Sequence, residues 1–437
     1  MQADVEAVVE AAWQVRRELA ATPAHVRASA LDHVSQQLAA RRAEVAALIT
    51  EEMGKPARWA DVEVTRAIST FRFAAEEARR WSGELQRLDT DPAATGRLAL
   101  VRRVPRGPVL GIAPFNFPLN LVAHKVAPAL AVGAPVIVKP APATPRTAEL
   151  LESVLAETDL PAGSHAVLAV DNETTQALVR DPRLPVVSFT GSVPVGWAIR
   201  DAVPRKHVVL ELGGNAAVVV CADYSADADL AWAAQRTALF AMYQGGQSCI
   251  AVQRVYVEAS VFEDFRGRLV AEVAALSPAD DVGPLVSDDA AARVESWVAE
   301  AVAGGASVLL GGERDGRLYR PTVLADVPAG AKVLDEEVFG PVVVLVRVGS
   351  VEEAFDAVND SRFGLQAGVF TRDLATAFRA GRELEVGGVV IGDVPSYRAD
   401  QVPYGGVKAS GAGREGVRAA MHDLTEEKVL VLTGVDL

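Results

Sequence analysis

Apolar and polar positions follow two different periods along this chain. From residue 3 to about residue 86 they repeat with the period of helices. The Thr22-Pro23 pair is expected to cap the second helix, with the proline in its first position, and Gly54 to end the third. In residues 97–104 polar and apolar side chains alternate roughly as in a strand. We expect this strand to be exposed, because one of its sides is too polar for a buried sheet. The chain is therefore predicted to open with a helical layer that is followed by an exposed strand.

Short apolar strands begin at residue 109 and alternate with helical segments. This spacing predicts a parallel, doubly wound sheet. A second series of strands follows from Ala216, so the expected fold class is α/β with two units and a cleft between them, where a cofactor and a substrate would meet. The predicted strands are 109–112, 136–138, 166–169, 186–189 and 208–210 in the first unit, with helices at 118–131 and 145–157, and 218–220, 252–257, 308–310, 342–348 and 389–391 in the second.

The bulk composition is that of a soluble globular protein. With 437 residues, of which 50% are apolar and 23% are charged, the chain is long enough for two or three domains. A net charge of −14 argues against nucleic acid and membranes as partners, because both favour basic faces. No apolar run reaches the ~18 residues of a membrane span, and the N-terminus lacks a signal-peptide pattern. Two cysteines cannot form a disulfide framework, so a cytoplasmic location is expected. No metal site is expected.

One of the two cysteines, Cys249, lies between a glycine-rich turn and an apolar strand. A thiol on such a tight backbone can be exposed, with backbone N–H groups near enough to support an oxyanion. The alternative is that Cys249 is a small buried hydrophobe, which is the commoner role of a lone cysteine. Cys221 ends the apolar run 218–220 and is interpreted as structural.

Four further positions carry polar groups that suit a cofactor or a substrate. Glu211 directly follows an apolar strand, where desolvation would raise its pKa towards the range of a general base. Asn116 places an amide in an apolar, proline-bounded turn, where it must find a partner. Lys139 ends a buried strand, and the Gly191-Ser192 turn opens a helix whose N-terminus attracts phosphate. Each has a structural alternative, namely a salt-bridged glutamate, an asparagine that satisfies backbone groups, a lysine that reaches to solvent and an ordinary capped turn.

Seven short motifs occur in order along the chain: Phe115-Asn116-Phe117-Pro118, Lys139-Pro140, Phe189-Thr190-Gly191-Ser192, Glu211-Leu212-Gly213-Gly214-Asn215, Gly246-Gln247-Ser248-Cys249, Glu337-Val338-Phe339-Gly340-Pro341 and Pro403-Tyr404-Gly405-Gly406. Each is weak alone, but in this order they closely resemble the aldehyde dehydrogenases, from about residue 5 to the C-terminus. The segments 246–257 and 394–400 are most similar to the lactaldehyde and phosphonoacetaldehyde dehydrogenase branch of that family.

The resemblance implies oxidation of an aldehyde to a carboxylic acid. Cys249 would attack the aldehyde as a thiolate to give a thiohemiacetal, while the Asn116 amide and the N–H of Cys249 hold the oxyanion. After hydride transfer to the nicotinamide, Glu211 would activate the water that hydrolyses the thioester. The alternatives are a CoA-acylating enzyme, in which CoA replaces water, and an inactive relative with a binding or structural role. The presence of Glu211 argues against the first, and the presence of all three residues argues against the second.

The resemblance also implies a site for NAD or NADP. Lys139 would bind the adenosine ribose, Ser192 the pyrophosphate, and Glu337 with Phe339 the nicotinamide ribose and ring. Many NAD-dependent members carry a glutamate at the position of Pro142, so no carboxylate there repels a 2′-phosphate, although the neighbouring alanines offer no donor to hold one. The expected cofactor contacts are Pro114, Phe115, Lys139, Pro142, Gly191, Ser192, Gly196, Leu212, Glu337 and Phe339.

The exposed strand 97–104 and the C-terminal run 428–433 resemble the strands through which the family oligomerises. Unpaired edges of this kind seek partners, so a homodimer or a homotetramer is expected. The predicted domains are an NAD(P)-binding domain at 1–88 and 106–212, an α/β catalytic domain at 213–412 and a small β oligomerisation element at 89–105 and 413–437.

The candidate substrate is a small aldehyde with an anionic or strongly polar substituent. Arg398 lies in a loop that borders the substrate entrance in the resembling branch, and Arg66 lies on a helix whose counterpart lines the same tunnel. Two guanidinium groups there would bind a carboxylate, phosphate or phosphonate. Phe117 would add an apolar wall, which argues against a highly charged pocket. The alternative is that Arg398 pairs only with Asp400, and Arg66 with Glu63.

Overall fold

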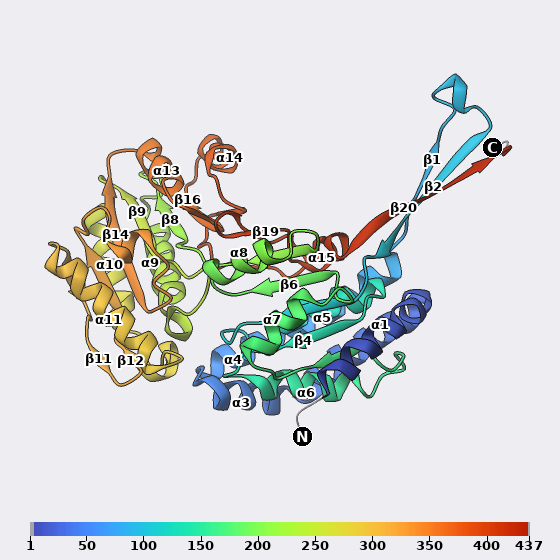
Figure 1. Cartoon of the computed structure of the whole chain (residues 1–437). Helices are drawn as coiled ribbons and strands as arrows, with labels where there is room; N and C mark the ends of the chain where they lie inside the picture. Colours follow the sequence, from blue (N-terminus) through green and yellow to red (C-terminus); the bar gives the residue numbers. More distant parts are fainter. Residues whose placement is uncertain (1–3, 436–437) are drawn as a thin grey trace.

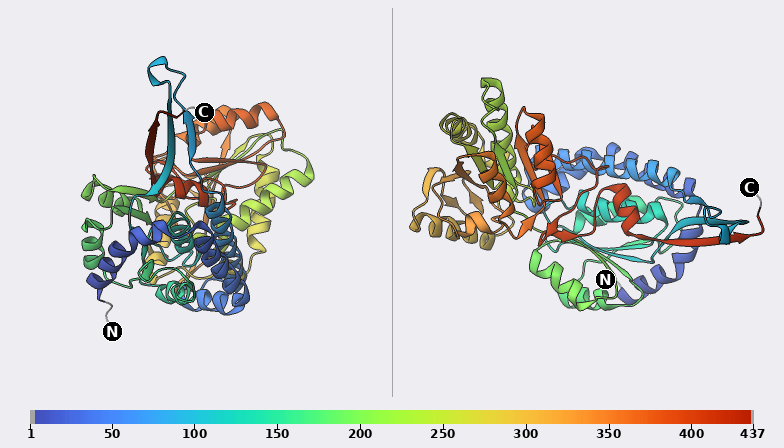
Figure 2. Two further views of the ribbon diagram at one scale, coloured as in Figure 1. Left: turned by 90° about the vertical axis from the view of Figure 1, so that its right-hand side faces the viewer. Right: turned by 90° about the horizontal axis from the view of Figure 1, so that it is seen from above.

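A computed structural model describes residues 4–435 as two lobes and a long arm (Figure 1). One lobe contains the N-terminal helices and the first large sheet, and the other contains the second large sheet. The arm projects from the first lobe, away from the second, as the turned views also show (Figure 2). The predicted class, with a doubly wound domain, a second α/β domain and a small β element, is confirmed.

Four helices open the chain. They are α1 (Val5–Ala21), α2 (Ala24–Ala40), α3 (Arg42–Met53) and α4 (Ala57–Arg80). The prediction that Thr22 caps α2 is wrong, because Thr22 ends α1 and its hydroxyl donates to the Glu18 carbonyl at 3.0 Å. Pro23 likewise precedes α2, because its ψ of 142° is extended. Gly54 ends α3 in the left-handed conformation, as predicted, with φ 74°.

The first sheet has the strand order β19-β7-β6-β3-β4-β5. Its elements are β3 (Val109–Ile112), α5 (Asn120–Val132), β4 (Val136–Lys139), α6 (Pro145–Leu155), β5 (His165–Val167), α7 (Asn172–Arg180), β6 (Val186–Thr190), α8 (Val193–Ala202), β7 (His207–Glu211) and β19 (Gly411–Ala412). All neighbours run parallel except β19, which is antiparallel to β7. Val109 and Val136 pack with α2 to α6, whereas Leu110 and Ile137 pack with α1 and α7, because successive side chains of a strand face opposite sides. Both faces are therefore buried, and all five predicted strands are present.

The second sheet has the strand order β10-β13-β14-β9-β8-β16-β17, with β10 antiparallel to its neighbour. Its elements are β8 (Ala217–Val220), α9 (Asp227–Met242), β9 (Arg254–Glu258), α10 (Phe262–Ala274), α11 (Asp288–Ala303), β10 (Ser307–Leu310), β13 (Thr322–Ala325), β14 (Val342–Val348), α13 (Val351–Asn359), β16 (Gln366–Phe370), α14 (Leu374–Glu383) and β17 (Gly388–Ile391). The sequence pattern predicts five of these strands but neither β13 nor β16. Gly368 interrupts β16 in sequence, yet a Cβ there would come within 2.5 Å of the Asp393 carbonyl, so close packing requires this weak strand former.

Short elements complete the second lobe. They are α12 (Lys332–Asp335), the ribbon of β11 (Arg314–Asp315) with β12 (Leu318–Tyr319), and the pair of β15 (Phe363–Gly364) with β18 (Val407–Lys408).

The arm is an antiparallel sheet of β1 (Glu84–Arg87), β2 (Arg97–Pro105) and β20 (Thr425–Thr433). The predicted exposed strand 97–104 is confirmed as β2. The prediction of helix to about residue 86 is wrong, because α4 ends at Arg80 and residues 84–87 pair with β2. This pairing is a tertiary contact that the local pattern does not show.

After β17 the chain returns to the first lobe. β19 joins the first sheet, and α15 (Val417–Asp423) packs against α4 and α5. The predicted domain limits stay predictions. No helix within residues 4–435 combines the length and the apolarity needed to cross a membrane.

Candidate active site

Cys249 lies in the loop between a 3₁₀ turn, Tyr243–Gly246, and β9. Gly246 has a φ of 66°, and a Cβ there would come within 2.1 Å of the Gly340 carbonyl, so the turn requires glycine. Cys249 is half-buried, and its Sγ lies 3.2 Å from the Tyr404 hydroxyl. The glycine turn therefore fixes where the thiol lies.

Burial raises the pKa of the Cys249 thiol to about 12. The hydrogen bond with Tyr404 and the charge of Arg398 lower this pKa, whereas the charges of Glu337 and Glu211 raise it. A nucleophilic thiolate therefore depends on the groups that oppose the effect of burial.

Glu211 is the last residue of β7, and its backbone carbonyl accepts a hydrogen bond from Gly191 N at 3.0 Å. Its side chain is buried, and neither carboxyl oxygen has a hydrogen-bond partner within residues 4–435. Burial, followed by the charge of Glu415, raises the pKa of Glu211 well above its ordinary value, in the predicted direction. A carboxyl group in this state suits a general base.

Asn116 lies in the loop between β3 and α5, and its Nδ2 donates to the Gln247 carbonyl at 3.0 Å. The backbone carbonyl of Asn116 accepts a hydrogen bond from Lys55 Nζ at 2.7 Å. Lys55 forms a buried ion pair with Glu63, and Glu63 also accepts the backbone N–H of Leu119 at 2.8 Å. These contacts tie the Asn116 loop to α4 on one side and to the Cys249 loop on the other.

Cys249, Glu211 and Asn116 line one cavity of about 280 Å³ between the lobes. The thiol comes from the second sheet's lobe, and the carboxyl and amide groups come from the first. The structure thus brings together the three predicted catalytic side chains, which are far apart in sequence.

A second cavity, of about 710 Å³, adjoins the first, and Pro114, Phe115, Gly191 and Ser192 line both. The larger cavity opens at the ends of β3, β4 and β6, the edge of a parallel sheet where nucleotides bind. Its size and its polar groups fit a dinucleotide.

Lys139 and Pro142 line this larger cavity, and burial lowers the pKa of Lys139. Ser192 is the N-cap of α8. Its hydroxyl accepts no hydrogen bond from a backbone N–H of α8, as far as the structure describes the chain, so it is available to a phosphate. Gly196 lines neither cavity; a Cβ there would come within 2.3 Å of the Leu212 side chain, which indicates a packing position.

The smaller cavity holds the two residues expected at the nicotinamide. Glu337 Oε1 accepts a hydrogen bond from Gly214 N at 3.1 Å, and burial raises the pKa of Glu337 to about 7. Phe339 has a φ of 47° and meets Phe115 edge-on, with 6.0 Å between the ring centres. Leu212 lines the same cavity.

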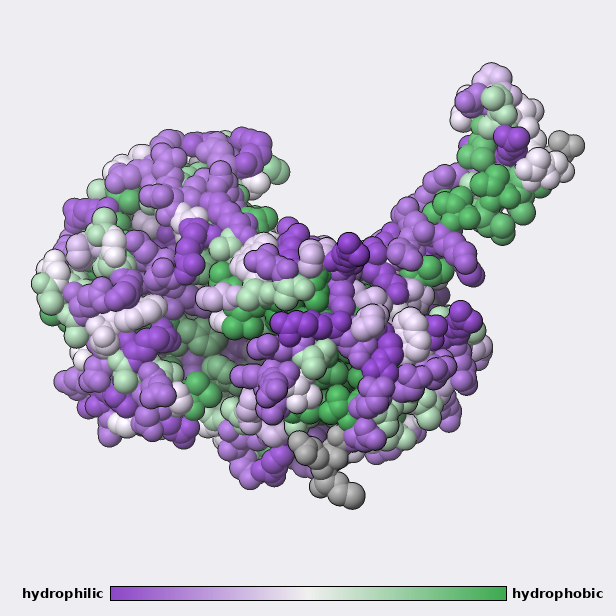
Figure 3. Space-filling view, viewed as in Figure 1, coloured by the Kyte–Doolittle hydropathy of each residue, from purple (hydrophilic) through white to green (hydrophobic). Residues whose placement is uncertain are grey.

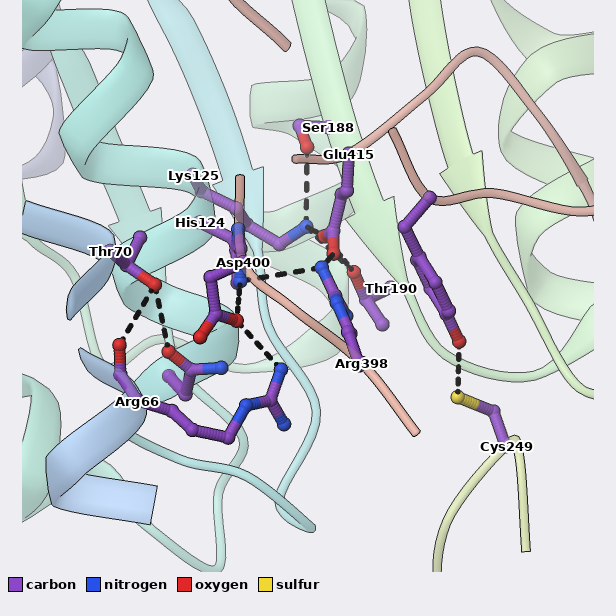
Figure 4. Close-up of polar contacts among 12 residues, drawn as sticks. Arg66, Thr70, His124, Lys125, Ser188, Thr190, Cys249, Arg398, Asp400 and Glu415 are labelled. Atoms are coloured by element: carbon purple, nitrogen blue, oxygen red, sulfur yellow. Dashed lines mark hydrogen bonds and ion pairs between the residues drawn. The ribbon is translucent and has the colours of Figure 1, made fainter. Parts of the chain in front are cut away.

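A buried polar network lies near the nucleophile (Figure 4). Arg66 pairs with Asp400 at 2.7 Å, and His124 Nε2 lies 3.0 Å from the same carboxyl oxygen. Arg398 pairs with Glu415 at 3.0 Å and lies 3.3 Å from His124 Nε2. The two arginines therefore have carboxylate partners, but not the ones considered from the sequence.

Lys125 extends the network towards the base. Its Nζ donates to Thr190 at 2.7 Å and to Ser188 at 3.2 Å, and lies 3.7 Å from Glu415. Glu415 thus lies between two cations, and their charges lower its pKa to about 2 although burial opposes this.

The sequence pattern did not indicate Lys125, Glu415 or Tyr404 as site residues. Lys125 leaves a detectable signal, because it is a lysine in a helix whose residues are all buried. Tyr404 lies inside the motif Pro403-Tyr404-Gly405-Gly406, but its contact with Cys249 forms only in the folded chain. Glu415 leaves no signal of its own.

Phe117 and the two arginines line neither of these cavities. The Phe117 ring lies under two cations, 4.3 Å from Lys55 Nζ and 5.9 Å from the Arg66 guanidinium carbon. Within residues 4–435, no group of three His, Cys, Asp or Glu side chains is placed to hold a metal ion.

A thiol, a buried carboxyl group and an amide line a cavity beside a second one of dinucleotide size, an arrangement that fits a dinucleotide-dependent oxidoreductase. The chain belongs to the aldehyde dehydrogenase family, whose model matches residues 1–430. It is 42% identical over 402 residues to a 3-sulfolactaldehyde dehydrogenase of Priestia aryabhattai, covering 90% of this chain and 83% of that protein.

Two solved structures are similar throughout. Aldehyde dehydrogenase 21 from Physcomitrella patens, in complex with the reaction product succinate, has a TM-score of 0.96 and 43% identity, covering 100% of this chain and 91% of that one. The NADP-dependent glyceraldehyde-3-phosphate dehydrogenase of Bacillus halodurans, complexed with NADP, has a TM-score of 0.94 and 34% identity, covering 100% and 92%. The protein is an NAD(P)-dependent aldehyde dehydrogenase, and the resemblance to the lactaldehyde-type branch is confirmed.

Proposed function

We propose that Cys249, Glu211 and Asn116 catalyse the oxidation. The Cys249 thiolate attacks the carbonyl carbon, a C–S bond forms, and an electron pair moves onto the oxygen. The Asn116 amide and the backbone N–H of Cys249 hold this oxyanion. A bound NAD(P)⁺ would supply the hydride acceptor that lets the thiohemiacetal on Cys249 become a thioester. Lys139, Ser192, Glu337 and Phe339 would hold the cofactor.

Glu211 completes the reaction. Its carboxylate takes a proton from water, the oxygen of that water adds to the thioester carbon, and the C–S bond breaks to release the acid and the Cys249 thiolate. The raised pKa of Glu211 supports this role, because a carboxylate that binds a proton more tightly is a stronger base. A base at this position favours water over CoA as the acyl acceptor.

We further propose that the substrate is a small aldehyde with an anionic group, which Arg66 and Arg398 attract. The observation that carries this proposal is that the Nε atoms of both arginines are buried and lack a hydrogen-bond partner within residues 4–435. A buried donor without an acceptor is unfavourable, and an anionic ligand would supply one. The positive charge of Arg398 also acts on Cys249, and that of both arginines acts on Tyr243, six residues before it.

The charge balance points the same way. The network contains the cations Arg66, Arg398 and Lys125 against the carboxylates Asp400 and Glu415, before Glu211 is counted. Because the raised pKa of Glu211 favours its protonated, neutral form, one further anionic group would balance the network. The named substrate of the Priestia relative carries a sulfonate, and the product in the Physcomitrella structure is a dicarboxylate.

The test compares succinic semialdehyde with butanal, a neutral aldehyde of the same chain length. The wild type should have the higher kcat/KM for succinic semialdehyde, and Arg398→Ala and Arg66→Ala should each reduce that preference by about tenfold or more. Arg72→Ala, on the exposed side of the same helix α4, is the control and should keep the preference. If the wild type prefers butanal and neither variant changes the ratio, the substrate is not anionic.

We also propose that the arm joins copies of the chain into a homodimer or homotetramer. Figure 3 shows apolar side chains gathered on the arm, well away from the body. Leu85 and Leu100 are exposed there. On β20, the side chains of Val429, Leu430 and Val431 are each at least half exposed. An apolar strand at the edge of a sheet, with unpaired backbone groups, favours pairing with another chain.

A complementary surface lies on the second lobe. β17 is an edge strand, and α14 beside it exposes Leu374 at 74% and Phe378 at 69%. The arm of one copy lies too far from α14 of the same copy to cover it (Figure 1). Exchange of arms between two copies would bury both surfaces in one symmetric assembly.

A further inference from the structure

We propose that the Tyr404 hydroxyl is a catalytic hydrogen-bond donor that stabilises the Cys249 thiolate, and that the Arg398 guanidinium stacked on its ring strengthens this donation. The inference rests on the proposed role of Cys249 as the nucleophile. It assigns to Tyr404 a function in setting the reactivity of the thiol before any aldehyde binds.

The first support is the position of the hydroxyl. Tyr404 Oη lies 3.2 Å from Cys249 Sγ, and within residues 4–435 it is the group that hydrogen-bonds to Sγ. The side chain is buried and packs with Ile250 and Leu365. Two backbone hydrogen bonds with Glu415, of 2.9 and 2.6 Å, hold the residue on both sides. The hydroxyl is therefore held beside the sulfur.

The second support is the cation on the ring. The Arg398 guanidinium carbon lies 3.9 Å from the centre of the Tyr404 ring, and Arg398 is itself held by Glu415. A cation over a phenol draws electron density from the ring and makes its O–H a stronger donor. Because the site is buried, this electrostatic effect is screened less than at the surface.

The third support is that Tyr404 must be the donor in the hydrogen bond to the Cys249 thiolate. A thiolate can only accept, so the hydroxyl must donate once Cys249 is ionised. Tyr404 keeps its proton, because burial raises its pKa well above its ordinary value of 10. The thiol needs this help, since burial and the charges of Glu337 and Glu211 all disfavour its ionised form.

The test measures the nucleophile directly, without aldehyde or cofactor. In a Cys221→Ala background, Cys249 is the remaining thiol, and its rate of alkylation by iodoacetamide is followed from neutral to alkaline pH. Tyr404→Phe keeps the ring and the stacked cation and removes only the hydroxyl. At pH values below the pKa of the thiol, the alkylation rate should fall by about tenfold, which corresponds to a rise of about one unit in that pKa.

Two further variants separate this effect from a loss of packing. Tyr256→Phe removes another buried tyrosine hydroxyl, one that contacts Arg254 and the Ala357 carbonyl, and should leave the alkylation rate unchanged. Replacement of Tyr404 by 3-fluorotyrosine, a stronger donor, should raise the alkylation rate above that of the wild type.

Equal alkylation rates in Tyr404→Phe and the wild type would overturn the inference. Faster alkylation in Tyr404→Phe would also overturn it, because the hydroxyl would then mask the thiol. A failure of the proposed function would look different, since Cys249→Ala would then retain turnover whatever the alkylation rates.

Discussion

Arg398 and Glu415 form a buried ion pair in which Nη2 and Oε2 lie 3.0 Å apart. Each partner has a second contact that bears on the chemistry. Arg398 stacks on Tyr404, which hydrogen-bonds to the nucleophile, and the charge of Glu415 raises the pKa of Glu211. One ion pair therefore links the surroundings of the nucleophile to those of the base.

Glu415→Gln should lower the pKa of Glu211. The negative charge of Glu415 favours the protonated form of Glu211, so its removal favours the carboxylate, and the uncompensated Arg398 and Lys125 act in the same direction. The acid limb of the pH profile of thioester hydrolysis should move to lower pH. Glu427→Gln, at an exposed ion pair in the arm, is the control. An unmoved acid limb would show that Glu415 does not act on Glu211.

Cys249→Ala should abolish aldehyde oxidation and leave cofactor binding intact, because it removes the nucleophile from the smaller cavity and touches the larger one little. Cys221→Ala should keep most activity, since Cys221, which directly follows β8, is buried and burial raises its pKa to about 12. Steady-state rates and cofactor titration measure both effects. Full turnover by Cys249→Ala would remove the thioester mechanism.

Glu211→Gln should uncouple the two halves of the reaction. Hydride transfer does not need Glu211, so rapid mixing should show a burst of about one equivalent of reduced cofactor per site, followed by turnover slowed by about a hundredfold. Added CoA should not restore the rate. A steady-state rate equal to that of the wild type would exclude Glu211 as the base, and acceleration by CoA in the wild type would favour the acylating reaction.

The wild type should accept NADP alongside NAD. Pro142 lines the larger cavity near Lys139, where a carboxylate would repel a 2′-phosphate. Pro142→Glu should therefore shift the ratio of kcat/KM values towards NAD, measured with both cofactors in parallel. A wild type that rejects NADP by about 1000-fold, which corresponds to about 4 kcal/mol, would show that Pro142 does not decide the preference.

Light scattering should give a mass of at least twice the 46.0 kDa of one chain. Leu430→Asp should weaken the assembly, because Leu430 is 57% exposed on β20 and a buried, unpaired charge opposes strand pairing. Val62→Asp, at an exposed apolar residue of α4, should leave the mass unchanged. A monodisperse species of about 46 kDa in the wild type would contradict the role of the arm.

Local sequence patterns predicted most of the fold because the α/β architecture follows from periodicity. Strands such as 109–112 and 136–138 are apolar on both faces, and a glycine such as Gly54 ends a helix wherever a left-handed residue is needed. The pattern failed at β16, where Gly368 is required by close packing, and at 84–87, which is a strand only because β2 lies beside it.

The order of the motifs identified the family and indicated Cys249, Glu211 and Asn116 as site residues. Each of these residues lies in a short motif that can be recognised without knowledge of its contacts in the fold. Only the tertiary structure decided which partners the charged side chains take. Arg66 binds Asp400, 334 residues away, whereas the sequence offered Glu63 on the same helix, and Glu63 instead pairs with Lys55. An ion pair depends on distance and burial in space, and neither is encoded in the spacing of residues along the chain.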